Sequence, residues 1–63
     1  MILTSERANL VLMAAQQGGY CMADRIEAQL TADEREHVKR VWAGMSGRAS
    51  WFDAFNRIRQ RGY

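Results

Sequence analysis

Cysteine and histidine are the most chemically versatile side chains in this chain, and each occurs once, as Cys21 and His37. Together they could form a nucleophilic thiol–imidazole pair, but no sequence signature brings them together, since they fall on different predicted helices. One cysteine cannot form an intrachain disulfide, and one Cys and one His cannot complete a zinc site. We therefore interpret Cys21 as a small buried thiol and His37 as a solvated side chain.

Carboxylates are the next candidates for chemistry, and Asp33, Glu34 and Glu36 are close together in the sequence. Paired carboxylates can act as a general acid and base. These three fall in the first turn of a predicted helix, where negative charge stabilises the helix dipole. Gly18-Gly19 lacks the spacing and the lysine of a phosphate-binding loop. We predict no catalytic residue, no metal, no cofactor and therefore no enzyme.

Arginine supplies eight of the nine basic residues, and residues 42–63 carry four arginines against the single acid Asp53. Arginine makes planar bidentate contacts that suit interfaces with protein or phosphate. Aromatic residues are interleaved with these arginines, and this composition is typical of binding hot spots. The predicted partner-binding residues are Arg48, Trp51, Phe52, Phe55, Arg57 and Arg61. A purely packed core remains the alternative for the aromatic residues.

The elements that position these residues are predicted to be helices throughout. Apolar residues recur at helical spacing, most regularly at Val38, Val41, Trp42 and Met45, and nothing has the alternation of a strand. We predict an all-α fold, a compact bundle of about four short helices with glycine-containing breaks, in one domain, 1–63. The predicted helices cover residues 4–17, 21–30, 32–45 and 48–60.

Capping residues mark where these helices begin. Thr4 is suited to cap the first helix, with Leu3 as the apolar residue before it. Thr31 and Glu34 have the Thr-x-x-Glu spacing of a capping box. Either Ser46 or Ser50 is expected to cap the last helix, and Ser50 with Asp53 resembles a second box.

Leu10 to Ala15 is an unbroken apolar run, so the first helix has no polar side there. A helix that is apolar all round requires cover on all sides. Three further helices with one apolar stripe each could surround it, which would leave excess apolar surface at Trp51 and Phe52. Self-association is the alternative cover, and its predicted residues are Leu10, Leu12 and Met13.

The length of 63 residues permits only a small core. Such chains bury about 60% of the surface that their unfolded form exposes, and many need a disulfide, a metal or a partner. No apolar run approaches the roughly 18 residues of a membrane span. The first residues lack the pattern of a signal peptide, so we expect a cytoplasmic protein that does not bind membranes.

These features favour a non-catalytic protein–protein interaction module of the inhibitor or adaptor type. Small accessory proteins of phages and mobile elements have this size and helix content, and they often act by binding a larger host protein. A homodimer is also expected. The alternative is a helix-turn-helix-like DNA-binding transcriptional regulator with helix 32–45 in the major groove. Asp33, Glu34 and Glu36 count against it because phosphates repel them, and the expected glycine is replaced by Leu30-Thr31.

Overall fold

Four helices make up most of the computed structural model, which describes residues 3–18 and 21–61. They are α1 (Ser5–Gln16), α2 (Met22–Gln29), α3 (Ala32–Ala43) and α4 (Trp51–Arg61), and the described residues contain no strand. The predicted all-α class is confirmed. The first three helices match the predicted ranges within two residues at each end, whereas α4 begins three residues later than predicted. Gly19, the second residue of the predicted Gly18-Gly19 break, lies outside the described residues.

Three of the helices begin at the predicted capping residues. The Thr4 hydroxyl accepts a hydrogen bond from the Arg7 N–H at 3.1 Å. Thr31 and Glu34 form the reciprocal capping box, with bonds of 2.8 and 3.2 Å. Ser50 and Asp53 form a second reciprocal pair at 2.9 and 3.1 Å, so α4 begins after Ser50 and not after Ser46. Residues 44–50 therefore form a loop between α3 and α4.

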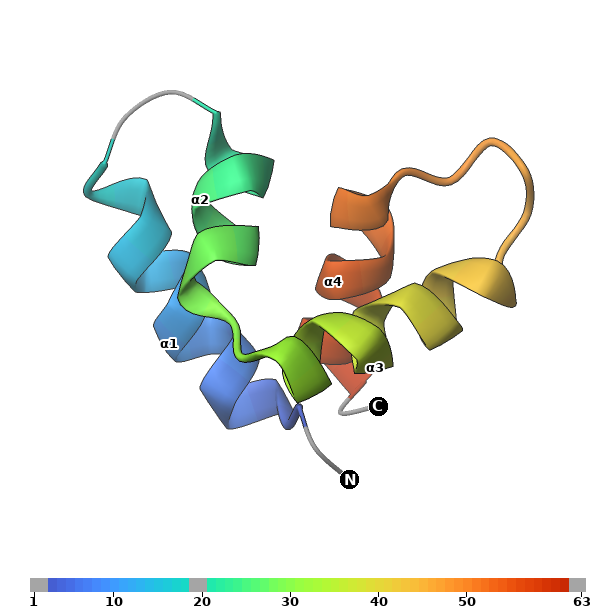
Figure 1. The fold of residues 1–63 in the computed structure, drawn as a ribbon, viewed down its shortest axis with the longest axis horizontal. Helices are drawn as coiled ribbons and strands as arrows, with labels where there is room; N and C mark the ends of the chain where they lie inside the picture. Colours follow the sequence, from blue (N-terminus) through green and yellow to red (C-terminus); the bar gives the residue numbers. More distant parts are fainter. Residues whose placement is uncertain (1–2, 19–20, 62–63) are drawn as a thin grey trace.

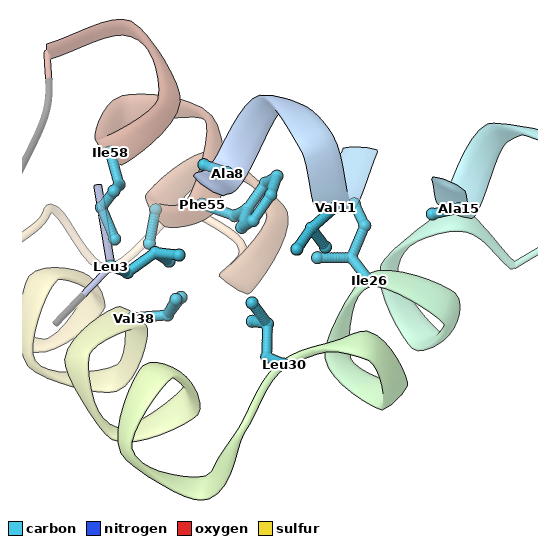
Figure 2. Packing of buried hydrophobic residues seen from close by; sticks show 10 residues of the cluster. Leu3, Ala8, Val11, Ala15, Ile26, Leu30, Val38, Phe55 and Ile58 are labelled. Carbon is cyan, nitrogen blue, oxygen red and sulfur yellow. The ribbon is translucent and has the colours of Figure 1, made fainter. Parts of the chain in front are cut away.

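Helix α4 occupies the centre of the arrangement, since it packs on both α1 and α3, while α2 packs on α1 (Figure 1). Figure 2 shows Leu3 near Val38 and Ile58, and Phe55 beside Ala8. Burial of these apolar side chains is the main favourable contribution to stability. The buried core consists of Leu3, Ala8, Val11, Ala15, Ile26, Leu30, Val38, Ala54, Phe55 and Ile58.

The beginning of α1 is also hydrogen-bonded to the end of α4. The Ser5 hydroxyl donates to the backbone carbonyl of Arg59. The Arg59 guanidinium donates to the side-chain oxygens of Asn9, at 3.3 Å, and Asn56, at 3.1 Å. Arg59 is therefore a structural residue that joins the first and last helices.

The prediction that three helices surround α1 is wrong. Val11 and Ala15 are buried, but Leu10 and Met13 remain 61% and 60% exposed. The physical reason is the topology: α3 packs mainly on α4, so only α2 and α4 cover α1 extensively. Excess apolar surface was predicted at Trp51 and Phe52, but both are half-buried against the core.

Candidate interaction surface

The predicted partner-binding residues lie in three different environments. Arg48 and Arg61 are exposed, while Trp51, Phe52 and Arg57 are half-buried. Phe55 is completely buried, so its assignment to a partner-facing surface is corrected. It lies on the inner side of α4, and its ring stacks on Trp51 with centroids 6.1 Å apart and planes 10° apart. Phe55 can therefore hold the Trp51 ring in position through this stacking contact, without itself contacting a partner.

Trp42 is an exposed aromatic residue, although its spacing predicts a place on the apolar stripe of its helix. It is 41% exposed, and its indole N–H donates to the backbone carbonyl of Ala49 at 2.8 Å. This hydrogen bond fixes the indole against the loop that leads into α4. Val38 is fully buried and Val41 is half-buried, so the stripe follows these residues and Trp42 lies at its edge. That edge position, beside the break at residues 44–47 with a glycine at each end, is the sequence signal that could have identified it.

An open depression lies along one side of α4, with a volume of about 340 Å³. Met45 lines this depression and follows Trp42 by three residues, and its backbone N–H donates to the Trp42 carbonyl at 3.0 Å. The lining residues are Met45, Asp53, Asn56, Arg57, Gln60 and Arg61. We call Trp42, Met45, Arg48, Arg57 and Arg61 the Trp42 face.

The Trp42 face and the depression together carry a net positive charge. Arg57 and Arg61 line the depression together with Asp53, whose carboxylate also accepts the Ser50 N–H of the helix cap. Arg48 is exposed in the loop next to Ala49, the residue that accepts the indole N–H of Trp42. Fixed aromatic area flanked by guanidinium groups can bind an acidic surface with apolar side chains.

The two residues with the most versatile chemistry have the reverse of their predicted environments. Cys21 was predicted to be buried, but it is exposed at the start of α2. His37 was predicted to be solvated, but it is half-buried, and its Nδ1 accepts the Leu3 N–H at 3.1 Å. Burial, with a contribution from the nearby Arg40 charge, holds the pKa of His37 below its ordinary value. This imidazole acts as a hydrogen-bond acceptor for the chain segment before α1.

The clustered acidic residues also have structural partners. Glu34 is buried and accepts hydrogen bonds from the Arg7 guanidinium at 2.9 and 3.3 Å. The hydrogen bond from Arg7 lowers the pKa of Glu34, and the same bond raises the pKa of Arg7. Within residues 3–18 and 21–61, no three His, Cys, Asp or Glu side chains are grouped so that they could hold a metal ion.

The start of α3 presents acidic groups to solvent, which bears on the alternative of a DNA-reading helix. Asp33 and Glu36 are exposed there, and Glu36 makes an ion pair with Arg40 at 4.0 Å. A recognition helix reads bases mainly through its N-terminal residues. Carboxylates at these positions repel phosphates, so this end of α3 is poorly suited to the major groove.

No family model, curated protein or solved structure matches this chain. Among the residues that the structure describes, no helix has both the length and the apolar character needed to cross a membrane.

Proposed function

We propose that this chain is a small non-catalytic interaction protein, of the inhibitor or adaptor type, that acts by occupying a surface on a larger protein. The observation that carries the proposal is Trp42, a large aromatic side chain that is exposed and yet held by the Ala49 carbonyl. A cytoplasmic location and an origin among phage or mobile-element accessory proteins belong to the same proposal.

A fixed tryptophan is an efficient anchor for binding. Association costs free energy for every side chain that must be ordered at an interface. The indole of Trp42 is already ordered by its hydrogen bond, so less of that cost remains to be met when a partner binds. Tryptophan and arginine are also the residue types most enriched at hot spots.

The surroundings of Trp42 define the chemistry of the partner. Arg48, Arg57 and Arg61 supply positive charge on the Trp42 face, and Met45 supplies apolar area beside Arg57 and Arg61 in the depression. The complementary surface has an apolar pocket for the indole and carboxylates around it. Such charge complementarity increases the association rate and the specificity more than the affinity itself.

Quantitative affinity capture from nuclease-treated host lysate tests the proposal with three baits. Wild type and Lys39→Ala, a control at an exposed position on the same helix, should enrich one common partner. Trp42→Ala should reduce its enrichment about tenfold or more, as expected for loss of a hot spot. Circular dichroism of each bait checks that the fold is retained.

Three outcomes would contradict the proposal. One is that no protein is enriched by wild type, and another is that Trp42→Ala captures the partner as well as Lys39→Ala does. The third is that the chain binds duplex DNA with an affinity that falls steeply with salt, since this dependence is the signature of phosphate contacts. That third result would instead support the DNA-binding alternative.

A further inference from the structure

The outer side of α1 is an exposed helix face that carries no charge over most of its length. From Ala8 to Gly18 the sequence contains no charged residue, and Leu10 and Met13 are both about three-fifths exposed. Figure 1 shows α1 along one edge of the molecule, with α2 and α4 on its other sides. An exposed face of this kind is distinct from the Trp42 face, which belongs to α3, α4 and the loop between them.

Four exposed residues along α1 and its C-cap form a seam with alternating spacings of four and three residues. Glu6, Leu10, Met13 and Gln17 are all exposed and follow one another at these intervals. This is the spacing with which two helices pack side by side along a shared seam. The apolar pair occupies the middle of the seam, and a polar residue stands at each end.

The seam is complementary to itself when two copies run in opposite directions. In that arrangement Leu10 of one copy lies opposite Met13 of the other, and Glu6 lies opposite Gln17. A two-fold axis produces both contacts twice, as an isologous interface requires. A parallel arrangement would instead place the two Glu6 carboxylates against each other, where their like charges repel.

Only one end of the seam is charged, and this also favours the antiparallel arrangement. Glu6 lies in the first turn of α1, whereas Gln17 at the other end is neutral. An antiparallel pair therefore places each Glu6 beside the neutral end of the second copy, and it also opposes the two helix dipoles favourably.

We propose that a second copy of this chain covers the outer side of α1, in an antiparallel α1–α1 pair centred on Leu10 and Met13. The pair is weak and concentration-dependent, because one helix face is smaller than the interfaces of permanent dimers. It leaves the Trp42 face open, so one dimer presents two copies of that face to larger partners.

Sedimentation equilibrium from about 10 µM to about 1 mM protein tests the association, a range that covers weak interfaces. The mass of wild type should rise from 7.2 kDa toward twice that value. Leu10→Lys and Met13→Lys should each weaken association about tenfold or more, because each places a charge in the apolar contact. Gln16→Lys, an exposed position on the same helix outside the seam, should associate as wild type does. A wild-type mass that stays at 7.2 kDa, or equal weakening by Gln16→Lys, would overturn the proposal.

Disulfide cross-linking tests the orientation without disturbing Leu10 or Met13. In a Cys21→Ser background, Glu6→Cys and Gln17→Cys are prepared as separate proteins and then oxidised alone or mixed. The antiparallel pair predicts cross-linked dimers in the mixture and none from either variant alone, since two copies of position 6 would lie about 16 Å apart. Cross-linking of each variant with itself, or no cross-link in the mixture, would refute the antiparallel pair.

Discussion

Arg7 on α1 and Glu34 on α3 form an ion pair in which the carboxylate, and not the arginine, is the buried partner. The Glu34 side chain is 8% exposed and the Arg7 side chain 43%. One Glu34 oxygen accepts from Arg7 Nε at 2.9 Å, and the other accepts from both Arg7 Nη2 and the Thr31 N–H. The same carboxylate therefore caps α3 and connects it to α1.

Replacing Glu34 should destabilise the fold much more than replacing a neighbouring acid. Glu34→Ala removes a capping group and leaves Arg7 without its carboxylate, and we expect a loss of about 2–3 kcal/mol in the free energy of unfolding. Glu36→Ala, the control, removes only an exposed ion pair and should cost less than about 0.5 kcal/mol. Urea unfolding measures the loss in the free energy of unfolding for each variant. Equal losses would show that the Arg7–Glu34 ion pair stabilises the fold no more than the exposed pair of Glu36.

Stability should decrease as the pH falls below the ordinary pKa of histidine. Because the pKa of His37 is lowered in the folded state from 6.5, the unfolded chain binds more protons just below that pH. The contribution is fully present above 6.5, is lost as the pH falls toward the folded-state pKa, and changes no further below it. Protonation also places a donor at Nδ1, where the Leu3 N–H needs an acceptor.

His37→Gln is the matched control for this pH dependence. The glutamine oxygen can accept the Leu3 N–H, but it does not titrate. Since His37 is the single histidine of the sequence, the variant should show a flatter stability profile between about pH 7 and pH 5. Thermal melts at closely spaced pH values make the comparison, and identical slopes for the two proteins would contradict the assigned role.

Truncation of two adjacent residues of α1 should change the free energy of unfolding by very different amounts. Val11 is 1% exposed, so Val11→Ala should cost about 2 kcal/mol through lost burial and the cavity left behind. Leu10 is 61% exposed, and Leu10→Ala should change stability by less than about 0.5 kcal/mol. Chemical unfolding at low micromolar protein concentration separates this effect from self-association. If Leu10→Ala lost more free energy of unfolding than Val11→Ala, the assignment of Val11 to the core and of Leu10 to the surface would be wrong.

The backbone at the start of α2 offers a stabilising substitution. Cys21 has φ 57° and ψ 53°, a left-handed conformation that costs free energy for most side chains, and its side chain makes no capping bond. Asparagine tolerates this conformation, so Cys21→Asn should raise stability by about 0.5–1 kcal/mol. Calorimetry should show a Tm higher by a few degrees, whereas the β-branched Cys21→Val should lower it. A lower Tm for Cys21→Asn would argue against strain at this position.

Local sequence signals predicted the helices well, because caps and periodicity act over a few residues. Thr4, Thr31 and Ser50 each bond the backbone within their own first turn, so their spacing alone identifies them. Ile26 on α2 and Leu30 directly after this helix are both buried, as their spacing of four residues predicted.

The parts that the sequence did not predict depend on packing between distant segments. The packing of α3 mainly on α4 determines which face of α1 is covered. The periodicity of residues 10–15 cannot predict this face, because all six residues are apolar. His37 acquires its partner from Leu3, thirty-four residues away along the chain. Phe55 and Trp42 both belong to apolar stripes, and only the assembled bundle determines that Phe55 is buried and Trp42 exposed.

The hydrogen bond from Ser5 to the Arg59 carbonyl has a consequence for the order of folding. The two residues are separated by 54 positions, and α4 is the helix on which both α1 and α3 pack. During synthesis, α1 cannot acquire this cover until Arg59 has left the ribosome. Contacts this distant in sequence slow the formation of the native state, since the intervening chain must close first. The contacts between α1 and α4 can therefore form only after all four helices have been translated.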